Sequence, residues 1–245
     1  MRLTRVHVPD PLTAGRRQTI EGDAANHITR VLRLKPGDPL IVFDGRGAEY
    51  TANIEAFRKD AVIVAVGDRS ATTRESSLSL TLAQGVSRGE RMDWVVQKAT
   101  ELGVTRIVPV MTERTVVKLD AKQSERKVAH WHGIAVAACE QSGRDRVPDI
   151  AIPVALHDFL RGSDAQATRL LLSPAGTQRI NDLKPMDAGI VVLIGPEGGL
   201  AEDEQRAAVS AGFVAVRLGP RVLRTETAAV AALTLLQHRF GDLVS

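Results

Sequence analysis

The residues best suited to chemistry lie in three loops rich in glycine and proline, all in the last third of the chain. Their sequences are SPAG at residues 173–176, GPEGG at residues 195–199 and GPR at residues 219–221. Glycine lets backbone N–H and C=O groups approach a ligand closely, because no side chain intervenes. Any one loop alone reads as a simple turn between a strand and a helix, whereas three together favour a binding site.

Each of these loops follows an expected strand. Short apolar runs at residues 170–172 and 190–194 precede the first two loops, and a third expected strand covers residues 214–218. All-apolar runs of this length are typical of strands covered on both faces. In doubly wound sheets ligands bind at the carboxyl ends of the strands. The sequence therefore predicts one ligand site where the three loops meet.

The loops lack the common phosphate-binding fingerprints. Neither G-x-G-x-x-G nor G-x-x-x-x-G-K-[ST] occurs in the chain. Glu197 lies in the middle of the GPEGG loop, where a phosphate would meet a like charge. A nucleoside ligand with a cationic centre and no phosphate, such as S-adenosylmethionine, suits this loop better. Two alternatives stay open at this point: a non-enzymatic RNA-binding protein and a phosphate-ligand enzyme such as a nucleotide-dependent oxidoreductase.

The elements that position the loops alternate between strands and helices from residue 78 onward. Strands are expected at residues 78–83 and 106–110, and helices at residues 124–141, 202–211 and 226–239. A further helix is predicted from apolar residues at helical spacing, ending at Gly103. That apolar face consists of Met92, Val95, Val96, Ala99 and Leu102. Such alternation predicts an α/β domain with a mostly parallel sheet.

The first part of the chain has a different pattern. Short β-prone segments up to about residue 67 are interrupted by one amphipathic helix, for which Asp23 is the expected N-cap. This layout is typical of a small barrel crossed by one helix. The polar segment at residues 68–77 is the expected linker. The predicted domains are therefore residues 1–70 and residues 78–245.

Composition excludes several classes of protein. Hydrophobic residues make up 44% of the chain and charged residues 25%, so a sizeable core is available. No apolar run has the length of a membrane span, and the N-terminus lacks the apolar core of a signal peptide. The only cysteine, Cys139, is expected in the core, and the histidines lack metal-site spacing. We expect a soluble cytoplasmic protein that binds neither metal nor membrane.

Two segments together carry a family resemblance. IGPEGGL at residues 194–200 and LGPRVLRTETA at residues 218–228 resemble the SPOUT methyltransferases, and more narrowly the bacterial family that methylates N3 of a uridine in 16S ribosomal RNA. Residues 26–33, 97–103 and 140–144 are similar to further segments of that family. The resemblance thus covers essentially the whole chain.

The resemblance implies an S-adenosylmethionine-dependent methyltransferase that acts on 16S rRNA of the small ribosomal subunit. It also implies a C-terminal SPOUT domain with a deep trefoil knot at roughly residues 190–235, a PUA-like RNA-binding N-terminal domain, and a homodimer formed through the knotted domain. The cofactor would bind in the knot. The implied cofactor-binding residues are Leu172, Ser173, Ile194, Gly195, Gly198, Gly199, Leu218, Gly219, Leu223, Thr225 and Ala228. For Thr225 the helix N-cap is a competing interpretation.

Methyl transfer to uridine N3 requires that nitrogen to lose its proton. A general base, or a group that stabilises the uridine anion, would contribute roughly 10²–10⁴-fold. Arg224 is the preferred stabiliser, because a guanidinium can neutralise charge developing on a uridine carbonyl. A phosphate contact or an ion pair with Glu226 is the alternative. Glu197 is the carboxylate expected near the sulfonium, and the sequence does not identify the base.

Five arginines are candidate RNA contacts. They are Arg5, Arg30, Arg33, Arg88 and Arg144. Arg30 and Arg33 are three positions apart on an expected helix, so both can point at one RNA backbone. The competing interpretation is an ordinary solvated helix face.

Overall fold

The computed structural model describes residues 3–71, 73–117, 119–184 and 188–243 of the chain. The chain divides into two compact units. The first consists of Met1–Glu75 with Val136–Val147, and the second of Ser76–Ala135 with Pro148–Ser245. The first unit therefore includes a segment from the middle of the chain, which no linear division at residues 68–77 would assign to it.

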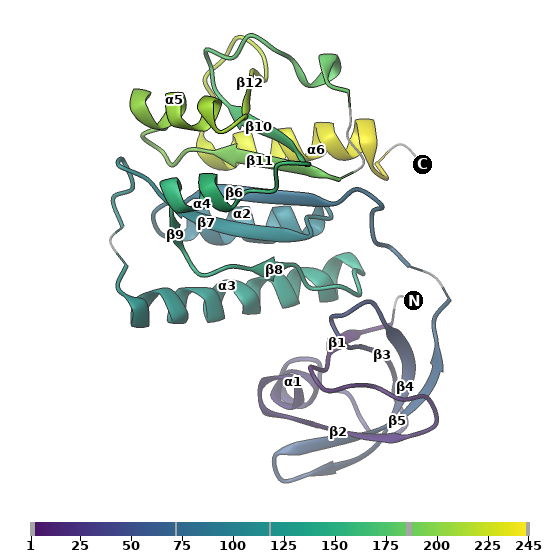
Figure 1. Ribbon diagram of the computed structural model, residues 1–245. Helices are drawn as coiled ribbons and strands as arrows, with labels where there is room; N and C mark the ends of the chain where they lie inside the picture. Colours follow the sequence, from purple (N-terminus) through teal and green to yellow (C-terminus); the bar gives the residue numbers. More distant parts are fainter. Residues whose placement is uncertain (1–2, 72, 118, 185–187, 244–245) are drawn as a thin grey trace. The chain divides into compact units, whose positions relative to one another are not determined.

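The first unit is built on a five-stranded sheet with the order β1-β3-β4-β5-β2 (Figure 1). The strands are β1 (Arg5–His7), β2 (Arg17–Glu21), β3 (Pro39–Phe43), β4 (Glu49–Arg58) and β5 (Ala61–Arg69). β1 pairs with β3 in parallel, and the other pairs are antiparallel. Alternate residues of β5 are buried, as expected for a sheet with one covered face.

One helix covers this sheet, and its geometry differs in detail from the expectation. α1 (Gly22–Asn26) continues directly into a single π-helical segment, η1 (His27–Val31). Ala25 and Ile28 are buried against the strands. The predicted N-cap was wrong: Glu21 is the N-cap residue, it makes no side-chain capping bond, and Asp23 lies in the first turn.

The second unit contains a parallel sheet with the order β12-β10-β11-β6-β7-β8, and β9 also pairs with β7. Its strands are β6 (Leu80–Gly85), β7 (Arg106–Met111), β8 (Asp149–Ile150), β9 (Val154–Ala155), β10 (Thr168–Leu172), β11 (Ile190–Ile194) and β12 (Val214–Val216). Every strand pair in this sheet is parallel, as predicted. β11 is buried along its whole length, because helices cover both faces of the sheet.

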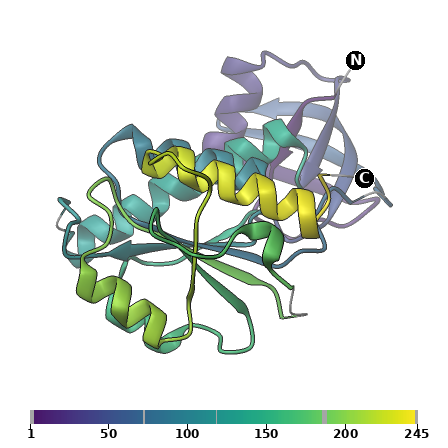
Figure 2. The ribbon, with the colours of Figure 1, turned by 90° about the horizontal axis from the view of Figure 1, so that it is seen from above.

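Helices flank this sheet on both sides (Figure 2). They are α2 (Glu90–Glu101), α3 (Ala121–Ser142), α4 (Leu156–Gly162), α5 (Glu202–Ser210) and α6 (Thr225–Phe240), with a 3-10 turn at Ile180–Asp182. α2 and α6 pack together, and α4 packs against α5. The predicted end of α2 is confirmed, because Gly103 follows the helix with a φ of 78° that favours glycine. Within the described ranges, no helix is both long enough and apolar enough to cross a bilayer.

Candidate active site

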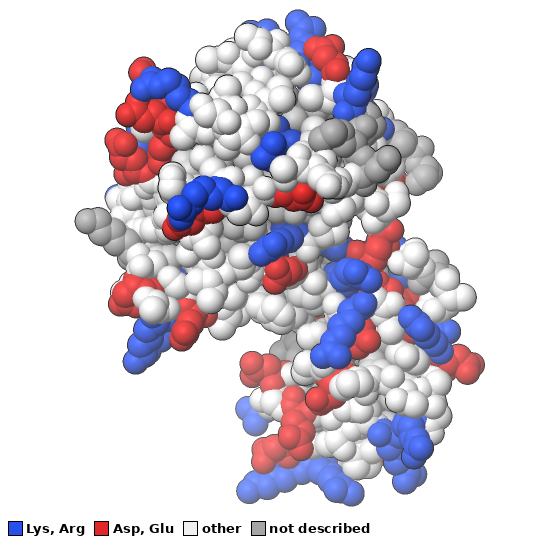
Figure 3. Space-filling view, viewed as in Figure 1, with Lys and Arg blue, Asp and Glu red and all other residues white. Residues whose placement is uncertain are grey.

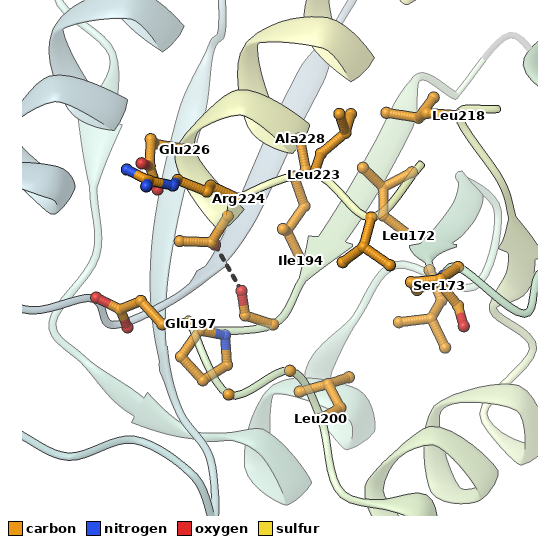
Figure 4. Close-up of a pocket in the computed structure, with 18 of the residues that line it drawn as sticks. Leu172, Ser173, Ile194, Glu197, Leu200, Leu218, Leu223, Arg224, Glu226 and Ala228 are labelled. Carbon is orange, nitrogen blue, oxygen red and sulfur yellow. Dashed lines mark hydrogen bonds between the residues drawn. The ribbon is translucent and has the colours of Figure 1, made fainter. Parts of the chain in front are cut away.

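The three glycine-bearing loops meet at one edge of the second unit's sheet. They follow β10, β11 and β12, and the strand order places these three strands side by side. The carboxyl ends of parallel strands face the same edge, so the loops converge around a cavity of about 490 Å³ (Figure 4). The crossover that puts β12 beside β10 therefore creates the site.

The residues that the sequence proposed for the cofactor all line this cavity. They are Leu172, Ser173, Ile194, Gly195, Gly198, Gly199, Leu218, Gly219, Leu223, Thr225 and Ala228. The two candidate catalytic residues, Glu197 and Arg224, line it as well. In Figure 4 the apolar side chains of Leu172 and Leu218 lie on one side, the charged groups of Glu197 and Arg224 lie on the other, and Ile194 lies between them. The cavity thus suits a ligand with an apolar part and a charged part.

Other elements contribute lining residues that sequence reasoning missed. Arg114 reaches the GPEGG loop from the segment after β7, and its Nη1 donates to the carbonyl of Gly198 at 2.9 Å. Gln205 comes from α5, and its Nε2 donates to the carbonyl of Leu200 at 3.1 Å. Gln205 carried one signal in the sequence, because it lies in the first turns of the helix that follows GPEGG. Nothing in the sequence marked Arg114 as part of the site.

Two glycines are required by the shape of the GPEGG loop. A Cβ on Gly195 would lie 2.9 Å from the carbonyl carbon of Gly199, which is closer than real Cβ contacts. Gly199 itself has a φ of 68°, a region that side chains disfavour. The loop therefore folds back on itself, and its residues line the cavity.

Thr225 connects this loop to the last helix. Its hydroxyl donates to the carbonyl of Gly195 at 2.7 Å and accepts a bond from Nε2 of Gln84 at 2.8 Å. The N-cap of α6 is Arg224, so the interpretation of Thr225 as the N-cap was wrong. The buried Thr225 side chain ties the two family-like segments together instead.

Glu197 is already paired at the edge of the cavity. Its Oε1 accepts from the backbone N–H of Arg88 and from Nη1 of Arg91, both at 3.0 Å. Burial acts to raise the pKa of Glu197, but these hydrogen bonds and the Arg91 charge outweigh it and hold that pKa below its usual value. The carboxylate is therefore ionised at neutral pH.

Arg224 is exposed beside the same cavity. The ion pair with Glu226 that the sequence allowed is not formed through Oε2 of Glu226, which has no hydrogen-bond partner among the described residues. Arg224 lines the cavity, so a bound ligand can meet its guanidinium, which Figure 4 draws beside the Glu226 carboxyl group.

Comparison with known proteins identifies the family. Residues 74–237 match an RNA methyltransferase domain, and residues 20–67 match an RNA methyltransferase PUA domain. The chain belongs to the RNA methyltransferase family. The family predicted from the GPEGG and LGPRVLRTETA segments is confirmed, as is the PUA domain.

Relatives of this methyltransferase align over nearly their full length. Ribosomal RNA small subunit methyltransferase E of Buchnera aphidicola is 31% identical over 99% of this chain and 98% of the relative. The Bacillus subtilis protein of that name is 32% identical, covering 90% of each chain. The Neisseria gonorrhoeae protein of that name, solved with S-adenosylmethionine, is 36% identical with a TM-score of 0.93 over 99% of this chain and 100% of that one. A Legionella pneumophila structure with the same bound cofactor is 40% identical, with a TM-score of 0.94 and the same coverage.

Two of the arginines expected to contact RNA are interior residues of the methyltransferase. Arg5 pairs with Glu49, and its Nη2 donates to the carbonyl of Arg144 at 2.8 Å. Arg144 in turn pairs with Glu75 at 2.7 Å. Both arginine side chains are only 4% exposed. The structure therefore contradicts a direct RNA contact by either guanidinium, because these groups bind carboxylates inside the first unit.

Arg30, Arg33 and Arg88 are exposed. The expected shared helix face of Arg30 and Arg33 was wrong, because η1 ends at Val31 and Arg33 follows it with a φ of 52°. Arg33 is the one residue other than glycine with positive φ in the described part of the chain. Among the described residues, basic and acidic side chains are interspersed over the face drawn in Figure 3, so charge alone marks no RNA surface there.

Cys139 lies in the core, as predicted. It is fully buried, and burial raises the pKa of its thiol to about 12, with the nearby Arg144 charge acting in the opposite direction. A thiol with so high a pKa is not a nucleophile at neutral pH. Among the residues that the structure describes, no cluster of three histidine, cysteine or acidic side chains could hold a metal ion.

Proposed function

We propose that this methyltransferase transfers the methyl group of S-adenosylmethionine to N3 of a uridine in 16S rRNA of the small ribosomal subunit. The observation that carries the proposal is the cavity at the β10, β11 and β12 loops, which has an apolar side and a charged side. It occurs in a chain whose relatives with TM-scores of 0.93 and 0.94 were solved with that cofactor.

The chain's own residues fit this cofactor. Leu172, Leu218 and Leu223 offer an apolar surface for the adenosine, and the glycine-rich loops offer backbone N–H and C=O groups for its polar edges. When bound, S-adenosylmethionine supplies an electrophilic methyl group on a positively charged sulfur. Glu197, ionised and on the charged side of the cavity, would stabilise that positive charge.

Arg224 would act on the uridine. Loss of the N3 proton leaves negative charge on the neighbouring carbonyl oxygens, and a guanidinium at the cavity edge would stabilise it. Removal of one such preorganised group costs roughly 10²–10³-fold in rate. Glu197 suits the role of general base poorly, since an efficient base has a pKa near the working pH and its pKa is lowered.

A knot and a homodimer belong to the same proposal. β12 lies at the edge of the sheet, whereas α6 begins beside the loop after β11 and packs on α2, so the chain crosses back over the sheet after β12. This crossover supports a trefoil knot at roughly residues 190–235. The homodimer is proposed from the family resemblance, and Leu235 of α6, a large apolar residue with 42% exposure, is a side chain that a second copy would cover. A cytoplasmic location, beside the ribosomal RNA, completes the proposal.

Calorimetry and nucleoside mapping test the proposal. We expect saturable binding of S-adenosylmethionine, and formation of N3-methyluridine when the protein is incubated with small subunits from a strain that lacks this modification. Absence of cofactor binding, with or without RNA, would support the RNA-binding alternative instead. A methyl group mapped to another atom would overturn the uridine N3 assignment and keep the methyltransferase.

A further inference from the structure

A buried glutamine lies next to the cofactor cavity without lining it. Gln84 is the penultimate residue of β6 and has no exposed surface. Its Nε2 donates to Oγ1 of Thr225 at 2.8 Å and to the carbonyl of Gly85 at 3.1 Å. Its Oε1 has no partner among the described residues. A buried amide with an unpaired oxygen is unfavourable for folding, so stability alone does not account for this residue.

The hydrogen bonds run in one direction, from Gln84 to the cofactor loop. The Thr225 hydroxyl has one hydrogen to donate. Because Nε2 of Gln84 donates to Oγ1, the hydroxyl hydrogen is left for the carbonyl of Gly195, which it reaches at 2.7 Å. The opposite amide orientation would place Oε1 against the Gly85 carbonyl, two acceptors facing each other, and is therefore disfavoured. We call this series of hydrogen bonds, which runs from Gln84 through Thr225 to Gly195, the Gln84 relay.

The Gln84 relay joins three elements around the site. It begins in β6, passes through the first residue of α6 and ends at the first residue of the GPEGG loop. The backbones are also in close contact here, since a Cβ on Gly85 would clash with the backbone nitrogen of Pro196. The relay therefore fixes the peptide between Gly195 and Pro196, one residue before Glu197, and at the same time the start of the helix that has Arg224 as its N-cap.

We propose that Gln84 is a positioning residue for methyl transfer, acting through Thr225 to set the GPEGG loop and Arg224 relative to each other. This inference rests on the proposed function, since it assigns the relay to the same cofactor site. Gln84 itself does not line the cavity, so its effect on the cofactor is indirect. The cofactor loop is the part of the site that the relay reaches by hydrogen bonds, so S-adenosylmethionine is the ligand with which its effect is measured.

The molecule offers a matched control. Gln237 in α6 is also fully buried and hydrogen-bonded, with its Nε2 donating to the carbonyl of Leu102 at 2.9 Å and its Oε1 accepting from Ser76 at 2.8 Å. It does not line the cavity. Gln84→Met and Gln237→Met thus make the same chemical change at two buried sites, one inside the relay and one outside it.

The experiment measures S-adenosylmethionine binding by calorimetry, single-turnover methylation and thermal unfolding on the full chain. Gln84→Met should weaken cofactor binding about tenfold, the scale of one lost hydrogen bond. Gln237→Met should lower the melting temperature and leave the cofactor Kd unchanged. Thr225→Val should behave like Gln84→Met, and Thr225→Ser, which keeps the hydroxyl, should restore binding.

A double-mutant cycle separates a relay from two independent effects. If Gln84 acts through Thr225, Gln84→Met/Thr225→Val binds the cofactor no more weakly than Thr225→Val alone. Additive losses, an unchanged Kd in Gln84→Met, or an equal loss in Gln237→Met would each overturn the inference. If Gln84→Met does not fold, the Thr225 variants test the inference instead. It is overturned if Thr225→Ser binds S-adenosylmethionine as weakly as Thr225→Val, because the hydroxyl would then not matter for binding. Failure of the wild-type chain to bind S-adenosylmethionine would instead overturn the proposed function.

Discussion

At the scale of single residues, the neighbours of each charged group at the cavity distinguish its role. Glu197 is bonded to the Arg88 backbone and to Arg91, so its charge is fixed and its pKa is lowered. Arg224 is exposed at the cavity, and Oε2 of Glu226 has no hydrogen-bond partner among the described residues. A guanidinium that lines the cavity can stabilise negative charge that develops on a substrate there.

Arg224→Ala should lose methyl transfer while the protein stays folded. We expect the single-turnover rate to fall roughly 10²–10³-fold, since one preorganised stabilising group is removed. The S-adenosylmethionine Kd and the melting temperature should change little, because Arg224 is exposed. Arg206→Ala is the control, since the carboxylates that pair with that exposed arginine of α5 in the described part of the chain belong to its own helix. Turnover equal to wild type in Arg224→Ala would remove its catalytic role.

Glu197→Gln should have a mild effect. The amide keeps an oxygen for the Arg88 N–H but loses the charge, so cofactor binding should weaken by a factor of about two to five, as for a partly exposed charge pair. Because the pKa of Glu197 is lowered, its carboxylate is ionised throughout the neutral range, and the pH–rate profile between about pH 6 and 9 should keep its shape. Glu202→Gln, at an exposed position in the first turn of α5, serves as the control. A profile that loses its acid limb in Glu197→Gln would identify Glu197 as the base after all.

At the scale of elements, the C-terminal end of α3 and the residues after it belong to the first unit. Arg144 and Arg5 are enclosed there with Glu49 and Glu75, and Asp145 is buried beside them. Burial and the nearby Glu75 charge raise the pKa of Asp145. The ionised form of Asp145 is thus disfavoured by the fold, whereas the neighbouring ion pairs need their carboxylates charged.

Asp145→Asn should stabilise the first unit at neutral pH. Folding raises the pKa of this carboxyl above its unfolded value of about 3.9. Below that value the carboxyl is protonated in both states and carries no penalty. As the pH rises through the folded pKa, the carboxyl becomes charged in the folded protein, and the free energy of unfolding falls. The substitution removes the penalty, so the melting temperature at pH 7 should rise by roughly 2–4 °C, the shift that about 1 kcal/mol gives at this chain length. The gain should shrink toward pH 4.

Asp60→Asn, in the exposed turn between β4 and β5, is the comparison for this change. It should leave the melting temperature unaltered at both pH values. A lower melting temperature for Asp145→Asn at pH 7 would mean that the Asp145 charge supports the ion pairs around it.

At the scale of the whole molecule, local patterns predicted the elements that are long or strongly apolar. β11 was visible as an unbroken apolar run, and the end of α2 was visible at Gly103. β8, β9 and α4 were not predicted. β8 and β9 have two residues each, which is too short to show a periodic pattern, and the buried residues of α4 are Leu156 and Leu160. Periodicity needs several repeats before it differs from chance.

The residues of the site were likewise predictable only where the signal was local in the sequence. The glycine loops were readable because glycine itself marks close backbone approach. The Gln84–Thr225 bond was not, since it joins residues 141 positions apart. The burial of Arg5 and Arg144 also depends on distant partners, Glu49 at 44 positions and Glu75 at 69 positions respectively. A charged residue in a sequence looks the same whether its partner is RNA or a buried carboxylate.

The final prediction concerns both units of the methyltransferase. Arg30→Ala/Arg33→Ala in the PUA unit should weaken rRNA binding and reduce the salt dependence, lowering the slope of log K against log salt by about 1.4 for two phosphate contacts on single-stranded RNA. The S-adenosylmethionine Kd should stay unchanged, because the cofactor cavity is lined by the second unit. Arg161→Ala/Arg206→Ala removes the same charge from arginines paired with Asp158 and Asp203, so its slope should match wild type. Equal slopes in the two double variants would mean that Arg30 and Arg33 contact no phosphate and only add to net charge.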